Sequence, residues 1–336
     1  MGLATTPAPR FQVDKLTLRT GIKLCTGAAT CAALLVLSAC DATPRRTPFP
    51  QARPAGLAPI GDTVVPRSAK SIDLERYYVK VQSDLLTRGL LRTDGGGPDT
   101  PFDTEDLVRN FENIALYDEY TRGALSPNGR RSSGQLSRWS GPVRINTEFG
   151  ASVPLDQRTL DKKNVDAYAA RLKRITGHSI TATPRNANFH VFVAGEDDAP
   201  FVQQRLKQLI PTMSTSQLDL FKTLPKSFYC LVIAVSDTGN PFNYTQAVAL
   251  IRAEHPDLVR LSCIHEEIAQ GLGLPNDSPG ARPSIFNDDD EFALLTSHDE
   301  ILLQMLYDPR LKQGMGADEI RPLTQAIAME KTGQPL

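Results

Sequence analysis

The sequence predicts an α+β domain, in which one twisted, mainly β-sheet of about five strands lies over a long helix. Two observations support this fold class. Short runs with the alternating or continuously apolar character of strands follow one another between residues 142 and 251. A single long helical pattern then runs from Asp257 to about Gly271 and ends in a glycine-rich exit. Hydrophobic residues make up 40% of the chain, which is enough for an ordinary core.

Two helices are predicted before the sheet. Apolar residues recur at helical spacing from Ser71 onward, and again from Thr104 to Tyr120. The run Asp94–Pro98, which contains three consecutive glycines, separates the two helices. We therefore expect a helical N-terminal part at residues 71–135 and the sheet-containing domain, with C-terminal helices, at residues 136–336.

Strands and helices then follow one another along the sheet-containing domain. Strands are expected at 142–149, 180–183, 189–194, 230–235 and 244–251. Helices are expected at 162–176, 200–209, 214–221, 257–271, 297–307 and 318–330. Pro256 suits the start of the long helix, because its missing N–H costs nothing there. Thr296 or Ser297 is expected to cap the next helix, with Asp299 or Glu300 completing a capping box.

Residues 1–39 have the layout of a bacterial lipoprotein signal peptide. Four basic residues precede an apolar run from about Cys25 to Ala39, which is shorter than a typical membrane-spanning helix. The run ends in Leu37-Ser38-Ala39-Cys40, which resembles a lipobox. That resemblance implies cleavage before Cys40 and a lipid, such as palmitate, on this cysteine. An ordinary cleaved signal peptide and an uncleaved anchor are the alternatives.

A lipid on Cys40 would anchor the protein to a membrane of the cell envelope, facing the periplasm. Asp41 resembles an inner-membrane retention signal and slightly favours the inner membrane. Residues 40–70 contain six prolines and few bulky apolar side chains, so we expect an extended tether there. The net charge of −1 gives no reason to expect nucleic acid as a partner.

Two cysteines, Cys230 and Cys263, belong to the folded part of the chain, whereas the other three lie in the signal region. In an oxidising compartment these two can form a disulfide. It would close a loop of about 34 residues and contribute roughly 3–4 kcal/mol on the chain-entropy account. Two buried free thiols are the alternative, because cysteine is common in protein cores.

The stretch from His265 to Asp277 gathers polar side chains on the long helix and its exit. A zinc protease of the zincin type needs two His one helical turn apart and a Glu beside the first; metzincins add a Gly and a third His. Read from His265, only the leading His-Glu pair fits that pattern. Read from the next residue, the pattern keeps its Glu and its Gly and replaces every His. The ligand positions are then Glu266, Gln270 and Asn276, with Glu267 as the Glu and Gly273 as the Gly.

Helix geometry favours the second of these registers. At about 100° per residue, the apolar residues of the helix gather on one face, with His265 at the edge of that face. We therefore expect His265 to flank the core rather than to bind a ligand. The candidate cleft residues are Glu266, Glu267, Gln270, Asn276 and Asp277. A solvated helix face is the alternative interpretation, because charged residues form such faces routinely.

This pattern resembles a degenerate metzincin, a zincin-like metalloprotease domain. Downstream, Pro283-Ser284-Ile285-Phe286 is similar to the metzincin Met-turn, with Phe286 at the Met position. Phe292–Tyr307 is similar to the closing helix of matrix-metalloprotease-like domains. From about Leu74 to its end, the chain also resembles an uncharacterised family of proteobacterial lipoproteins, domain of unknown function 2927. That second resemblance implies no established activity.

The replaced histidines change which cations the site would bind. Glu, Gln and Asn make a poor zinc site and suit harder cations. We therefore predict no cofactor: zinc is not expected, and calcium is a candidate if a cation binds. Asp277 and the acidic run Asp288–Glu291 lie nearby in the sequence. The run lacks the spacing of a calcium loop, so it is more simply interpreted as an exposed acidic loop.

Three functions stay open at this point. The first is a pseudoprotease, a non-catalytic envelope lipoprotein that binds a peptide or another envelope protein, with a peptide lying along an edge strand at Tyr244–Ile251. The second is an active metal-dependent peptidase with non-His ligands and Glu267 as its catalytic general base. The third is a structural tether without a functional cleft. The missing histidines favour the first.

Overall fold

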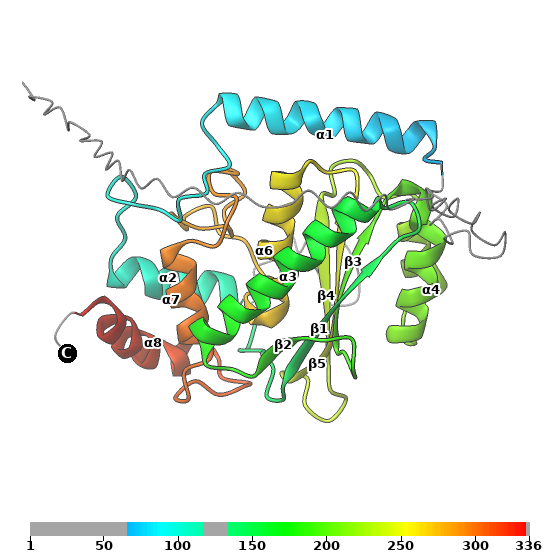
Figure 1. Cartoon of the computed structure of the whole chain (residues 1–336). Helices are drawn as coiled ribbons and strands as arrows, with labels where there is room; N and C mark the ends of the chain where they lie inside the picture. Colours follow the sequence, from blue (N-terminus) through cyan, green and yellow to red (C-terminus); the bar gives the residue numbers. More distant parts are fainter. Residues whose placement is uncertain (1–65, 117–133, 334–336) are drawn as a thin grey trace, which may run out of the picture. The chain divides into compact units, whose positions relative to one another are not determined.

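The computed structural model describes residues 66–116 and 134–333 (Figure 1). The predicted signal peptide, the lipidation site Cys40 and nearly all of the predicted tether lie outside the described residues. The predicted end of the second helix, beyond residue 116, lies outside them as well. Within the described ranges, no helix has both the length and the apolar character that a membrane span requires.

A five-stranded mixed sheet forms the centre of the fold, with the strand order β2-β1-β3-β5-β4. Its strands are β1 (Val143–Phe149), β2 (Ile180–Ala182), β3 (Phe189–Ala194), β4 (Cys230–Ser236) and β5 (Tyr244–Arg252). The first four strands in that spatial order pair in parallel, whereas β4 is antiparallel to β5. The predicted α+β class with about five strands is therefore confirmed.

The edge strand of the sheet is β4 rather than β5. β5 lies between two neighbours, so that Ala247 is opposite Phe189 of β3 on one side and Ala234 of β4 on the other. The prediction that a peptide would lie along Tyr244–Ile251 is therefore wrong, because both edges of that strand are already paired. The sequence conceals this arrangement, since the last strand in chain order inserts between two earlier ones.

Eight α-helices accompany the sheet in the part of the chain that the structure describes. They are α1 (Ala69–Thr87), α2 (Thr104–Ala115), α3 (Leu155–Thr176), α4 (Ala199–Leu209), α5 (Thr215–Asp219), α6 (Asp257–Gly273), α7 (Ser297–Leu306) and α8 (Ala317–Thr332). Short 3-10 turns cover Glu196–Asp198 and Leu220–Lys222. The largest difference from prediction is the early start of α3. The only apolar residues in its first two turns, Leu155 and Leu160, are five positions apart and exposed, so the apolar spacing did not reveal these turns.

Helices lie on both sides of the sheet (Figure 1), and each face of the sheet packs in its own hydrophobic core. On one face, α3 and α6 pack against the strands in the larger core, which extends to α2, α7 and α8. On the other face, α4 packs in a smaller core that contains Phe192 of β3, Leu231 of β4 and Leu250 of β5. Alternate residues of β4 therefore belong to different cores, because successive side chains of a strand point to opposite faces.

The two N-terminal helices belong to the same structural unit as the sheet. Tyr78 of α1 is fully buried, packs edge-on against His255 and donates a hydrogen bond to the carbonyl oxygen of Lys226 (2.9 Å). Ser71, near the start of α1, donates its hydroxyl to the buried carboxylate of Glu254 (2.8 Å). These contacts attach α1 to the segment that connects β5 to α6 and to the segment before β4.

Candidate functional site

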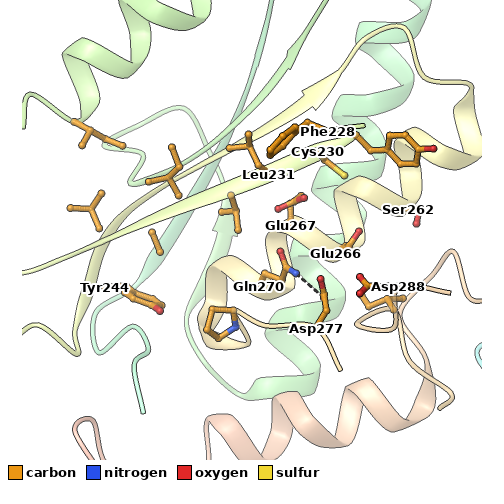
Figure 2. Close-up of a pocket in the computed structure, with 18 of the residues that line it drawn as sticks. Phe228, Cys230, Leu231, Tyr244, Ser262, Glu266, Glu267, Gln270, Asp277 and Asp288 are labelled. Carbon is orange, nitrogen blue, oxygen red and sulfur yellow. Dashed lines mark hydrogen bonds between the residues drawn. The ribbon is translucent and has the colours of Figure 1, made fainter. Parts of the chain in front are cut away.

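A pocket of about 850 Å³ runs along β4 (Figure 2). All seven residues of β4 line one wall of the pocket. The opposite wall comes from α6, which contributes Ser262, Glu266, Glu267 and Gln270. The segment after α6 and the loop at residues 285–292 contribute further lining residues. The pocket therefore brings most of the predicted cleft residues against the edge strand of the sheet.

Gly271 allows α6 to approach the sheet closely. A Cβ atom at this position would lie 2.5 Å from Cζ of Phe189 and 3.1 Å from Cγ2 of Val232. The carbonyl oxygen of Gly271 accepts a hydrogen bond from the indole N–H of Trp139 (2.8 Å), and that of Leu272 accepts one from the hydroxyl of Tyr307 (3.0 Å). These bonds satisfy carbonyl groups that a helix C-terminus leaves without partners inside the helix.

Gly273 turns the chain at the end of α6. Its φ of +131° suits glycine, and a Cβ here would lie 2.5 Å from the carbonyl oxygen of Ser137. The turn brings Asp277 back beside α6, where its Oδ1 accepts a hydrogen bond from Nε2 of Gln270 (3.1 Å; Figure 2). The backbone conformation and the close packing at Gly273 therefore account for this glycine of the protease-like pattern without a bound metal.

His265 belongs to the core rather than to the pocket. Its ring stacks on Tyr168 with the centroids 4.0 Å apart, and its Nδ1 accepts a hydrogen bond from the backbone N–H of Leu295 (3.1 Å). Burial, with a smaller effect of the Arg171 charge, lowers the pKa of His265 to about 3. The imidazole is therefore neutral at pH 7 and holds α6 against α3 and the loop before α7.

Asn276 is the candidate cleft residue that does not line the pocket. Its amide nitrogen donates to the carbonyl oxygen of Asn113 (2.8 Å) and to that of Asp277 (2.9 Å), so the side chain connects this segment to α2. The following residue, Asp277, lines the pocket in its place. Helical spacing could not predict this shift, because the direction of these side chains is set by the turn at Gly273, beyond the helix.

The pocket is acidic. Its described lining residues include five carboxylic acids and no Lys, Arg or His. The five acids are Glu266, Glu267, Asp277, Asp288 and Asp290. Glu267 is 4% exposed, and carboxylate oxygens of Glu266 and Glu267 lie within 4.8 Å of each other. Burial and the neighbouring charges of Asp289 and Asp288 raise the pKa of Asp290, and the positive charge of Arg88 partly offsets this rise.

A disulfide joins two walls of the pocket. It connects Cys230, the first residue of β4, to Cys263 on α6, with the two Cα atoms 5.9 Å apart. Cys263 is buried, whereas Cys230 is half-buried and lines the pocket. The sulfur of Cys230 lies within 4.8 Å of carboxylate oxygens of Glu266 and Glu267. The distance between the edge strand and the acidic helix is therefore fixed covalently.

The side chains of the pocket do not fit a zinc ion. No histidine is among the described lining residues, and zinc sites in proteins are built from imidazole and thiolate ligands with some carboxylates. Cys230 cannot supply a thiolate while it is bonded to Cys263. Two carboxylates remain in that group, whereas calcium usually takes about six to eight oxygen ligands.

The loop that closes the pocket is anchored on α7. The hydroxyl of Ser284 donates to Oδ1 of Asp299 (2.6 Å), and the backbone N–H of Ile285 donates to Oδ2 (3.0 Å). Asp299 also forms a capping box with Thr296, which confirms the predicted cap of this helix. Phe286 is fully buried in the larger core. This loop holds Ile285 in the wall of the pocket.

Sequence reasoning missed one wall of the pocket. Ile210 and Met213, from the connection between α4 and α5, line it together with Phe228, which precedes β4. These three residues belong to the smaller core, on the face of the sheet opposite α6. Their sequence shows only apolar side chains near helix ends, and no signal in it indicates that the edge strand passes beside them.

Comparison with known proteins identifies a family. No curated protein and no solved structure matches the chain. A sequence model of the family described as "Protein of unknown function (DUF2927)" matches residues 104–326. The matched region begins with α2 and ends within α8, so it contains the whole sheet, α6 and the loop that closes the pocket. Because the match covers more than half of the sequence, the chain belongs to the DUF2927 family.

Proposed function

We propose that this protein is a non-catalytic binding protein that holds an extended polypeptide along β4 as an added strand. One observation carries this proposal. Among the described strands, β4 pairs only with β5, and the pocket follows its other edge over the whole length of the strand. Backbone N–H and C=O groups at the edge of a sheet can pair with the main chain of another polypeptide.

The proposal includes the metzincin-like character of the domain and the loss of zinc-dependent peptidase activity. α6 lies beneath the sheet and presents to the pocket two of the motif's three ligand positions, Glu266 and Gln270, and its general-base position, Glu267. The chemistry of these side chains argues against a zinc centre, whereas a binding role requires only the edge strand and the cavity beside it.

The proposal also places the domain in the bacterial cell envelope, facing the periplasm on a lipid attached to Cys40. The disulfide between Cys230 and Cys263 supports an oxidising compartment. Replacing Cys40 with Ser should release the protein from the membrane fraction, because the thiol that carries the lipid would be absent. A Cys31→Ser variant is the matched control and should stay membrane-bound. If Cys40→Ser also stays bound, this part of the proposal is wrong.

Backbone-methylated peptides test the added strand directly. A neutral seven-residue peptide of alternating Thr and Val has the length of β4. N-methylation of alternate residues removes the N–H donors along one edge of the peptide and leaves the other edge intact. We expect methylation of the residues whose N–H groups face β4 to abolish binding, and methylation of the alternate residues to preserve it, as measured by fluorescence anisotropy. Equal binding of both methylated peptides would exclude strand pairing.

An active metal-dependent peptidase is the second candidate, with Glu267 as its general base. The observation that favours it is the placement of the Glu266 and Glu267 carboxylates within 4.8 Å of each other inside the pocket. Metal analysis of the purified protein tests it, since stoichiometric zinc would overturn the non-catalytic proposal. In this alternative, Glu267→Gln would abolish peptide hydrolysis and leave the melting temperature nearly unchanged.

A further inference from the structure

We propose that the polypeptide bound along β4 carries basic and apolar side chains in alternation, with the basic ones directed toward α6. This inference rests on the proposed function and specifies the class of its ligand. It follows from the different chemistry on the two sides of the cavity, together with the period of two that an extended strand imposes on its side chains.

The two faces of β4 define the two sides of the cavity. Cys230, Val232 and Ala234 pack with the larger core on the α6 side, whereas Leu231 and Ile233 pack with the smaller core on the α4 side. A strand added beside β4 in the plane of the sheet would follow the same alternation. Its side chains would therefore enter the α6 side and the α4 side of the pocket in turn.

The α6 side of the cavity fits cations. Glu266 and Glu267 project from α6, and Asp277 and Asp288 come from the segments that follow it (Figure 2). No Lys, Arg or His stands among the described lining residues. A positively charged side chain that entered here would meet carboxylates from two walls.

The α4 side of the cavity fits apolar groups. Ile210 and Met213 line it and join the smaller core with Phe228 and Leu231. Met adapts its shape to different apolar partners, so this side suits aliphatic side chains of several sizes. Basic and apolar residues on opposite faces of one extended peptide would therefore match both sides of the pocket at once.

Capped heptapeptides test this inference on the full chain in detergent. Three have Val alternating with Lys, Thr or Glu, and a fourth contains the Lys and Val residues in two separate blocks. We expect the Lys/Val peptide to bind at least about tenfold more tightly than the Thr/Val peptide, and the Glu/Val peptide to bind most weakly. The block peptide should lose most of this advantage, because its Lys side chains point to both faces.

Variants connect the preference to the pocket. The double variant Glu266→Gln/Asp288→Asn, which neutralises two of the four carboxylates on the α6 side, should remove much of the advantage of Lys/Val over Thr/Val and leave Thr/Val binding unchanged. The control, Asp156→Asn, neutralises an exposed carboxylate on α3 outside the lining and should change neither affinity. Circular dichroism of each variant verifies that the fold is retained.

The outcomes separate this inference from the function on which it rests. If Thr/Val binds and Lys/Val binds no more tightly, the inference is wrong and the strand-binding function stands. If the block peptide binds as tightly as the alternating Lys/Val peptide, net charge alone explains the attraction and the inference is wrong. Stoichiometric binding of calcium that abolishes peptide binding would also overturn it, because the carboxylates would then form a cation site. Failure of all four peptides to bind would overturn the proposed function itself.

Discussion

Two acidic sites in this fold, Glu148 on β1 and the carboxylic acids of the pocket, have very different surroundings. Glu148, on β1, accepts a hydrogen bond from Nδ1 of His190 (2.6 Å) and two from the guanidinium of Arg205 (2.7 and 3.0 Å). The pocket along β4 gathers five carboxylic acids in a described lining that contains no basic residue. Glu148 stabilises the packing of α4 on the sheet, whereas the second site brings five acidic side chains together around one cavity.

The pKa values of Glu148 and of Asp290, one of the pocket acids, shift in opposite directions. Burial raises the pKa of Glu148, but the hydrogen bonds and charges of His190 and Arg205 outweigh burial and lower it to about 2. In the pocket, burial and the charges of Asp289 and Asp288 raise the pKa of Asp290. The folded state thus favours the ionised form of Glu148 and disfavours that of Asp290. Four predictions test this contrast and the disulfide that holds β4 against α6.

The largest effect is expected from removing the disulfide that holds β4 against α6. The double variant Cys230→Ala/Cys263→Ala should lose about 3–4 kcal/mol of unfolding free energy, because the closed loop no longer restricts the unfolded chain. Urea unfolding followed by circular dichroism measures the loss. The wild-type protein in excess dithiothreitol is the control and should fall to a similar stability. If the double variant is as stable as the oxidised wild type, the disulfide does not contribute to the fold.

A smaller loss is expected from Glu148→Gln. The neutral amide forfeits the charge-assisted hydrogen bonds and leaves Arg205 and His190 without their anion, so we expect a loss of about 2–3 kcal/mol at pH 7. Urea unfolding provides the measurement. Glu330→Gln is the matched control, because Glu330 forms only an exposed ion pair with Arg310 and its loss should cost much less stability than that of Glu148. Equal losses in the two variants would remove the distinction between a buried and an exposed pair.

The same variant predicts a pH dependence of defined sign. The pKa of Glu148 is about 2 in the folded protein against 4.5 for the unperturbed group, so its contribution is fully present above pH 4.5. It is lost progressively as the pH falls from 4.5 to about 2. Unfolding curves of the wild type and of Glu148→Gln should therefore differ at pH 7 and converge near pH 2. A constant difference across this range would contradict the lowered pKa of Glu148.

The sequence predicts the elements of this fold better than their arrangement. Apolar periodicity locates every strand of the sheet and α6, because packing against a core imposes that periodicity on the chain. The insertion of β5 between β3 and β4 has no local signature, so the edge strand was assigned to the wrong segment. The register Glu266, Glu267, Gln270 follows from helix geometry, whereas the direction of Asp277 depends on the turn at Gly273.

The smallest effect, and one of opposite sign, is expected from Asp290→Asn in the pocket. Because the pKa of Asp290 is raised, the ionised carboxylate costs folding free energy at pH 7, and its neutral amide should stabilise the protein by a few tenths of a kcal/mol, at most about 1 kcal/mol. Asparagine also tolerates the φ of +57° at this position. The gain should be present at pH 7 and vanish as the pH falls below 3.8, where aspartate is protonated in both states. Melting temperatures at pH 7 and pH 3 measure it, with Asp156→Asn, an exposed position on α3 outside the pocket lining, as the control that should change little. A loss of stability at pH 7 would mean that the Asp290 charge supports the fold as Glu148 does, and the contrast between the two groups of carboxylates would not hold.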